Sequence, residues 1–237
     1  MTPLAIDLFC GLGGWTEGLL AEGYRVVGFD IERHAYGDHQ YPGQLVLQDV
    51  TTLDGAQFKS AALIVASPPC QAYSYRAMPW SRAKALPPPD NSLFDACFRI
   101  QREASAAAGH PIPLVVENVR GAQPYVGRAR WHHGSFYLWG DVPALMPITW
   151  RVKPKIIAGH INQRNGHRST VHLTNPIEHG IKQSGISGLR ANGKGDRWFQ
   201  DGAARHGSKS LSRQAASALI AKIPIGLASH VARAWKP

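Results

Sequence analysis

The stretch DLFCGLGGWTEGL, residues 7–19, joins an apolar run to a helical one through a turn rich in glycine. The apolar run LAIDLF, residues 4–9, is predicted to be a buried strand, and residues 16–22 have the composition of a helix. Gly11, Gly13 and Gly14 fall between the two. Ligands of open α/β sheets bind at the carboxyl ends of strands, where glycine lets the backbone approach closely. The turn therefore indicates a ligand site, although a tight turn alone would also use glycine.

The same alternation continues along the first 140 residues. A helix is predicted over residues 92–108, and runs rich in Val, Ile and Leu predict strands at 25–30, 45–50, 63–67, 114–119 and 136–140. Strands that alternate with helices predict an α/β protein with a doubly wound, mostly parallel sheet. Residues 151–208 show little periodicity, and from residue 211 two helices are predicted on either side of Pro224.

The net charge of +10 is concentrated in one segment. Residues 151–213 hold twelve Lys or Arg against three acids, a net charge of +9. Such clustering predicts a polyanionic partner, because cations that neutralise phosphates release their counterions; a solubilising face is the alternative interpretation. We expect a catalytic domain at 1–150, a short irregular basic lobe at 151–210, and C-terminal helices at 211–237 that pack back on the catalytic domain.

Cysteine usage and hydropathy bear on the compartment. The three cysteines, Cys10, Cys70 and Cys97, form no CxxC pair, and no secretory segment or run of bilayer length is evident. We therefore expect the protein to lie in a reducing cytosol. We do not expect a membrane to be its partner. Cys10 and Cys97 fit small buried apolar residues.

Two acids follow the second and third predicted strands. Asp30 ends the second strand, and Asp49 lies near the end of the third. An acid at the second strand end commonly holds ribose hydroxyls, so the pair indicates a pocket for a nucleoside-containing cofactor. Gly14 and Asp30 are closer in sequence than in many dinucleotide-binding proteins. Either acid could instead cap a helix or turn.

Cys70 follows the fourth predicted strand, and Glu117 lies at the end of the fifth. Cys70 comes after Pro68 and Pro69, whose fixed φ presets the position of the thiol in a loop where ligands bind. A thiol in such a place could act as a nucleophile if its thiolate were favoured. Glu117, in ENV at 117–119, would share the same cleft and could exchange a proton with a heterocycle. A solvated carboxylate is the alternative interpretation for Glu117.

In combination these motifs resemble the DNA (cytosine-5-)-methyltransferase family. The similarity lies in DLFCGLGG, SPPCQ and ENV, in the family's order, with weaker matches at NSLF (91–94) and IPIGLASHVARAW (223–235). It covers residues 4–140 and 211–236 and skips the basic segment, which in the family is the target-recognition region. The resemblance implies a Rossmann-like fold, S-adenosylmethionine (SAM) as methyl donor and double-stranded DNA as partner, with the protein acting as a monomer.

The resemblance also implies residue roles. Cys70 would be the nucleophile that adds to C6 of a flipped cytosine, Glu117 would hydrogen-bond N3 and the exocyclic amine, and Asp30 would hold ribose. Asp49 would hold adenine, which would contact the apolar Ile31. The residues implied at the SAM pocket are Phe9, Gly11, Gly13, Asp30, Ile31, Asp49, Val50, Pro68 and Leu93.

The chain departs from the family pattern in three places. The Gln-x-Arg-x-Arg block has no glutamine here, and among Arg128 and Arg130 we favour Arg130 as the residue that serves the substrate. The late motif with a Gly-Asn pair is compressed to IPIGLAS, and the recognition region of 60 residues is short. The resemblance further implies that the loop at 79–89, with Arg76, Arg82 and Lys84 around it, would close over DNA.

Other functions stay open at this point. The same chemistry could act on RNA or with a modified donor, and a noncatalytic nucleic-acid-binding protein is a third possibility that the presence of both Cys70 and Glu117 disfavours. Amine methyltransferases are disfavoured because they carry Asp/Asn-Pro-Pro-aromatic where this chain has Ser-Pro-Pro-Cys. A zinc site is disfavoured because the histidines lack cysteine partners and the usual spacing. Restriction-modification and a viral role are equally compatible with the sequence.

Overall fold

A computed structural model describes residues 2–73, 87–134, 136–146, 156–161, 168–172 and 211–237. Its centre is a seven-stranded sheet in the order β5-β2-β1-β6-β7-β9-β8. The strands are β1 (Leu4–Leu8), β2 (Arg25–Asp30), β5 (Gln44–Leu47), β6 (Ala61–Ala66), β7 (Leu114–Asn118), β8 (Trp131–His133) and β9 (Phe136–Gly140). A small antiparallel pair, β3 (Ala35–Tyr36) and β4 (His39–Gln40), lies between β2 and β5 in the chain.

Four of the six pairings in the sheet are parallel. β1 pairs with β2 and β6, β2 with β5, and β6 with β7, all in parallel. β9 runs antiparallel between β7 and β8. The predicted doubly wound, mostly parallel sheet is therefore confirmed, and the strand at 136–140 has the predicted bounds. The short strand β8 was not predicted, because three residues are too few to show a period.

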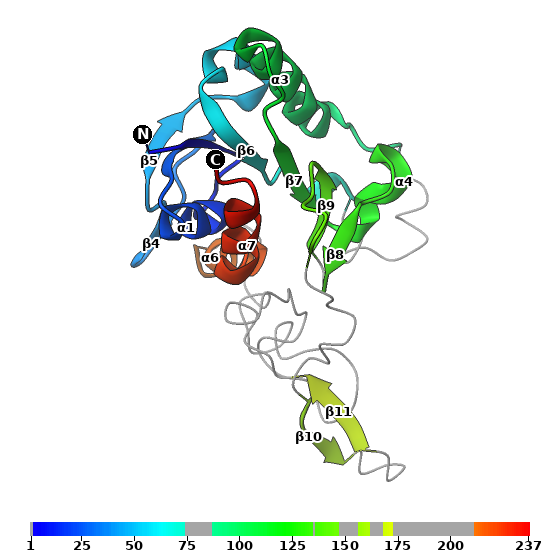
Figure 1. Cartoon of the computed structure of the whole chain (residues 1–237). Helices are drawn as coiled ribbons and strands as arrows, with labels where there is room; N and C mark the ends of the chain where they lie inside the picture. Colours follow the sequence, from blue (N-terminus) through cyan, green and yellow to red (C-terminus); the bar gives the residue numbers. More distant parts are fainter. Residues whose placement is uncertain (1, 74–86, 135, 147–155, 162–167, 173–210) are drawn as a thin grey trace.

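Helices cover both faces of the sheet (Figure 1). On one face α3 (Ser92–Ala108) packs in a core cluster that includes Ile100, Ile64 and Leu114. On the other face α1 (Gly14–Ala21) and α7 (Ile225–Ala234) pack in a second cluster that includes Trp15, Val65 and Val231. Residues 64 and 65 thus point to opposite faces, as the pleat of a strand requires, and both are apolar because both faces are covered.

Two glycines let the C-terminal helices approach α1. A Cβ placed on Gly18 would lie 2.4 Å from Ala228 Cβ, and one on Gly14 would lie 2.4 Å from Ile223 N. Both contacts are too short for any other residue. Gly14 therefore serves helix packing, a role that its place in the glycine turn did not indicate.

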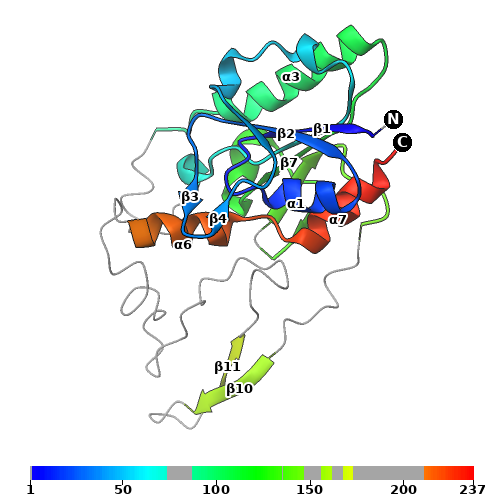
Figure 2. The same ribbon diagram turned by 90° about the vertical axis from the view of Figure 1, so that its left-hand side faces the viewer.

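The last helices follow one another closely. α6 (Leu211–Ala221) ends three residues before Pro224, the residue before α7, so the predicted break is at the predicted residue. Figure 2 shows α6 passing beside β3 and β4, and contacts join α6 to β3. The N- and C-termini lie near each other in the same view.

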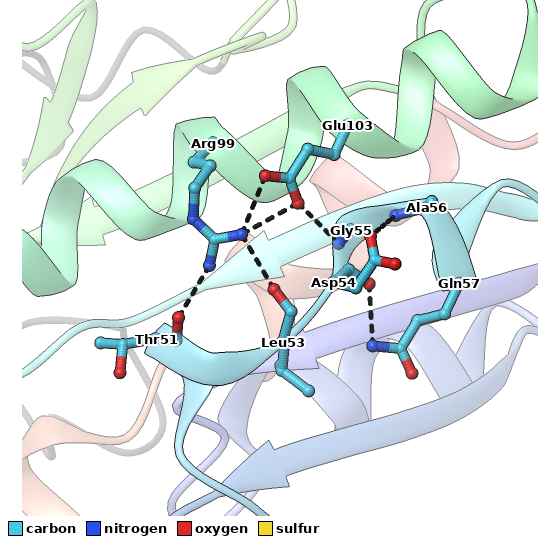
Figure 3. A network of polar contacts seen from close by, with 8 residues as sticks. All are labelled: Thr51, Leu53, Asp54, Gly55, Ala56, Gln57, Arg99 and Glu103. Carbon is cyan, nitrogen blue, oxygen red and sulfur yellow. Dashed lines mark hydrogen bonds and ion pairs between the residues drawn. The ribbon is translucent and has the colours of Figure 1, made fainter.

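A polar network fixes the segment after β5 to α3 (Figure 3). This segment contains two short 3₁₀ helices, η1 (Val50–Thr52) and η2 (Gly55–Phe58). Arg99 on α3 donates to the carbonyl oxygens of Leu53 (2.9 Å) and Thr51 (3.1 Å), and Glu103 accepts from the N–H of Gly55 (2.7 Å). The network holds η1, which starts at Val50, in a fixed place above the sheet edge.

Within the basic lobe the structure describes two strands, β10 (Ile156–Ile161) and β11 (Arg168–His172), which pair antiparallel. Sequence analysis predicted no strand in this lobe, so for these two segments the expectation of irregular structure is wrong. The rest of the lobe, Arg76 and residues 79–86 of the predicted DNA-facing loop, Arg82 and Lys84 among them, lie outside the described residues.

Candidate active site

A cavity of about 400 Å³ opens at the carboxyl ends of β1, β2, β5 and β6. This volume is within the usual range for a small-molecule site. The residues that line it are Phe9, Cys10, Gly11, Leu12, Gly14, Trp15, Asp30, Ile31, Glu32, His34, Asp49, Val50, Ser67, Pro69, Gln71, Leu93, Ala218, Ala221, Lys222 and Ile223. Seven residues predicted at the SAM pocket are among them: Phe9, Gly11, Asp30, Ile31, Asp49, Val50 and Leu93.

The turn after β1 has an unusual backbone. Phe9 has a φ of 56°, a left-handed value that is uncommon for a bulky residue, and Gly11 follows with a φ of 50°. Cys10 N donates to Phe29 O (3.1 Å), which ties the turn to β2. Backbone strain of this kind concentrates at ligand sites, where the surrounding structure holds it.

Asp30 holds this turn in place. Its Oδ2 accepts a hydrogen bond from the N–H of Gly11 (2.9 Å), and its Oδ1 accepts from the N–H of Glu32 (3.3 Å). Burial by itself would raise the pKa of Asp30, but His34 and the two N–H groups together outweigh it and hold the pKa below its usual value. Asp30 is therefore a carboxylate at neutral pH.

His34 lies beside Asp30 in the cavity wall and was not predicted. Its Nε2 is 3.6 Å from Asp30 Oδ1 and 3.7 Å from Glu32 Oε1. The interaction with Asp30 raises the pKa of His34. A histidine four residues after the strand-end acid is the only sign of this role in the sequence.

Asp49 lines the cavity and also caps η1. Its Oδ1 accepts from both the N–H and the hydroxyl of Thr51, each at 2.8 Å. These two hydrogen bonds lower the pKa of Asp49. The capping interpretation left open by the sequence thus holds for Asp49, and one of its carboxylate oxygens is committed to it.

Two side-chain hydrogen bonds position the loop that carries Cys70. Asn118 at the end of β7 donates from Nδ2 to Pro68 O (3.0 Å), and its Oδ1 accepts from Val119 N (2.8 Å). Trp15 on α1 donates from Nε1 to Ser67 Oγ (3.0 Å). The Asn of ENV is therefore the residue that joins the two predicted catalytic segments, a function that the sequence did not suggest.

Cys70 follows β6, and Glu117 is the penultimate residue of the neighbouring strand β7, just before Asn118. Ala66 of β6 pairs with Val116 of β7, so the residues after them reach the same edge. Glu117 is buried, whereas Cys70 is partly exposed. The structure thus brings a partly exposed thiol and a buried carboxyl group to the same edge of the sheet. Their catalytic roles stay predictions. Cys97 is buried on α3, and Cys10, also buried, lies in the cavity wall.

Five predicted residues are not among those that line the cavity. Cys70 lies between Pro69 and Gln71, which do line it, and Glu117 lies in β7. Among the described residues, Gly13 and Pro68 are outside the set that lines the cavity; Gly13 has a φ of 75° just before α1, and Pro68 contributes its carbonyl to Asn118. Arg130 is exposed just before β8, and its N–H donates to Leu138 O (2.8 Å). Leu138 pairs with both Glu117 and Trp131, so alternation places Trp131, rather than Arg130, on the face that Glu117 shares. The substrate role of Arg130 stays a prediction.

The C-terminal wall of the cavity was missed altogether. Ala218, Ala221, Lys222 and Ile223 come from α6 and the residues after it, about 200 positions from the glycine turn. Helical periodicity predicted α6 but gave no sign of what the helix covers.

Neither a metal centre nor a membrane span is found in the part of the chain that the structure describes. No three His, Cys, Asp or Glu side chains gather there in a way that could hold a metal ion. The helices within the same ranges include none with the length and hydropathy to cross a membrane.

The sheet, the two helical layers and the cavity at the carboxyl ends of the strands define a Rossmann-like α/β protein. Residues 4–125 match the family described as C-5 cytosine-specific DNA methylase, and the chain belongs to that family.

The relatives are matched over part of their length. The type II methyltransferase M.DdeI of Desulfomicrobium norvegicum is 31% identical over 125 residues, which are 49% of this chain and 28% of that protein. Among solved structures, an Escherichia coli prophage protein described as a DNA modification methyltransferase is 28% identical, with a TM-score of 0.38 over 53% of this chain and 35% of that one. Schizosaccharomyces pombe Dnmt2 methyltransferase is 17% identical, with a TM-score of 0.35 over 54% and 37%. The chain thus spans about a third of the length of these relatives.

Proposed function

We propose that this protein transfers a methyl group from SAM to C5 of cytosine in DNA. The observation that carries the proposal is the family match over residues 4–125, which includes both Cys70 and Glu117. The cavity supports it, because Pro69 and Gln71, the neighbours of Cys70, line that cavity, and a methyl donor must lie next to the base that it modifies.

The residues around the cavity fit SAM. When bound, SAM supplies an electrophilic methyl group. Asp30, a carboxylate at neutral pH, would accept hydrogen bonds from the ribose hydroxyls. Ile31 has 73% of its surface exposed at the cavity, and such an apolar side chain would cover one face of adenine. Asp49 would accept from the adenine amine with the oxygen that Thr51 does not use.

Cys70 would begin the reaction on a cytosine turned out of the duplex. Turning the base out costs a few kcal/mol of stacking and pairing. The Cys70 thiolate forms a bond to C6, and the electron pair of the C5–C6 double bond makes C5 nucleophilic. Glu117 would hydrogen-bond N3 and the exocyclic amine, which stabilises the charge that develops on the ring.

The last steps of the cycle remove the proton from C5 and release Cys70 from C6. After C5 takes the methyl group, a base removes the C5 proton, the C5–C6 double bond re-forms and Cys70 leaves as thiolate. The loop that Asn118 anchors would keep the thiol in line with C6 throughout.

The basic segment at 151–213 supports DNA as the substrate. Its net charge of +9 would neutralise backbone phosphates, so DNA affinity should fall steeply with salt. A flat salt dependence would mean that this segment does not face the phosphates.

The test is transfer of label from SAM to mixed-sequence duplex DNA, followed by single-base mapping of 5-methylcytosine. We expect label at a short recurrent cytosine context. An RNA of the same sequence is the matched substrate control. Label in RNA alone would replace the substrate, and SAM binding without transfer to either would contradict the enzymatic proposal.

A further inference from the structure

Lys222 is the basic residue of the cavity's C-terminal wall. It lies between α6 and α7, lines the cavity, and exposes only 17% of its side chain. Its Cγ lies 2.9 Å from where a Cβ on Gly14 would be, so its stem crosses the first residue of α1. Its Nζ donates to Glu17 Oε1 at 2.5 Å.

The surroundings of Lys222 favour a second anion. A lysine ammonium has three N–H donors, and Glu17 accepts one of them, so two remain for a ligand. The first-turn N–H groups of an α-helix have no acceptor inside the helix, and Gly14 and Trp15 bring that end of α1 into the cavity wall. A cation and a helix N-terminus thus converge on one part of the cavity.

The other part of the cavity carries the acids. Asp30 and Glu32 follow β2, and Asp49 follows β5, whereas Lys222 lies over the start of α1. A ligand with hydroxyls and an amine at one end and a carboxylate at the other would match this division of charge. SAM, with its adenosine and its amino-acid end, has these groups.

We propose that Lys222 binds the carboxylate at the amino-acid end of SAM. The inference rests on the proposed function, because it takes SAM as the occupant of the cavity. The Gly-Asn pair expected near this position by resemblance is absent, and Lys222 directly precedes the compressed motif that begins at Ile223. A charged side chain would then supply the contact that fixes this end of the cofactor.

The chain offers a matched control. Arg233 on α7 pairs with Glu22, just after α1, at 2.7 Å, so two ion pairs join the C-terminal segment to the α1 region. Arg233 is 69% exposed and does not line the cavity. Loss of Arg233 should therefore reproduce the loss of an ion pair without the loss of a ligand contact.

The experiment compares two ligands by calorimetry on the full chain. S-adenosylhomocysteine carries the carboxylate, and 5′-methylthioadenosine lacks the whole amino-acid end. Lys222→Met should weaken S-adenosylhomocysteine binding by about tenfold or more, the usual effect of losing a charge-assisted hydrogen bond. Binding of 5′-methylthioadenosine should change by less than about twofold. Lys222→Arg should keep most of the affinity for both ligands, and Arg233→Met should change neither.

Each other outcome has a definite meaning. Equal weakening for both ligands in Lys222→Met, or unchanged affinity for both, would overturn the carboxylate contact. Failure of Lys222→Arg to restore binding in a folded protein would do the same. If the unmodified protein binds neither ligand, the proposed cofactor itself is wrong, and the assignment of Lys222 falls with it.

Discussion

The two halves of the sheet's carboxyl edge are held together in different ways. In the cofactor half, at the ends of β1, β2 and β5, carboxylates that accept backbone N–H groups fix the wall of the cavity, as Asp30 does from Gly11; the cavity also reaches the end of β6. In the base half, at the ends of β6 and β7, the loop before Cys70 is tied to the neighbouring strand by the Asn118 side chain. Under the proposed function, the cofactor half would bind SAM and the base half would present the Cys70 thiol to the target cytosine.

This difference implies that binding and turnover can be separated by mutation. Substitutions in the cofactor half should lower ligand affinity, and substitutions in the base half should lower the rate at saturating ligand. A variant that moved both quantities equally would show that the halves are coupled.

Cys70→Ala should have the largest effect. Methyl transfer should fall below detection because no other step can activate C5, while SAM affinity should stay within about twofold of the original. Label transfer and calorimetry on the same preparation measure both. Retained turnover would refute the nucleophile assignment and with it the role given to the base half.

Asp30→Ala should have the next largest effect, in the other half. Loss of the carboxylate removes the hydrogen bond from Gly11 and, under the proposed function, the acceptor for ribose, so affinity should fall by about tenfold to a hundredfold. Unlike Lys222→Met, this variant should weaken S-adenosylhomocysteine and 5′-methylthioadenosine alike. Weakening of only one ligand would place Asp30 away from the adenosine end.

Asn118→Leu should reduce kcat by about tenfold with little change in SAM affinity, because the Cys70 loop loses its link to β7. Gln101→Leu is the control: Gln101 Nε2 donates to Ile112 O (3.0 Å), which lies before β7, at the opposite end of that strand from Asn118. Both variants should lose about 1–3 kcal/mol of stability, but only Asn118→Leu should lose rate. A loss of rate in both would mean that stability alone limits activity.

The smallest effect on function is expected at Asp7, in β1 before the glycine turn, where stability rather than activity should change. Burial is the main cause that raises its pKa from 3.8 to about 8, and its Oδ1 is buried with no hydrogen-bond partner, although Oδ2 accepts from Thr16 at 2.7 Å. The pKa of Asp7 is higher in the folded protein than in the unfolded chain. Between about pH 4 and 8, Asp7 is therefore protonated in the folded protein and ionised in the unfolded chain. The contribution of Asp7 to stability is therefore fully present below this window and is lost as the pH rises through it.

Asp7→Asn should flatten this pH dependence, because a neutral amide cannot ionise. The difference between variant and original protein should change by a few kcal/mol between about pH 5 and 8, measured by urea unfolding. Asp38→Asn, at an exposed acid, should leave the slope unchanged. An unaltered slope in Asp7→Asn would mean that Asp7 is already charged in the folded protein.

The sequence by itself determined the parallel core of the sheet, α3 and the residues that meet at its carboxyl edge. Runs of Val, Ile and Leu recur wherever a strand is covered on both faces, so residues 25–30 and 136–140 have the predicted bounds. Parallel strands bring their carboxyl ends to one edge, which is why Asp30, Asp49, Cys70 and Glu117 could be assigned to the same edge of the sheet from order alone.

Only the tertiary structure decided the contacts made across long separations. Gly14 and Gly18 admit α7, Asn118 holds the Cys70 loop, and Lys222 closes the cavity from about 200 residues away. None of these depends on a local period or a turn preference. They follow from which surfaces pack together, and packing is fixed by the whole core rather than by any one segment.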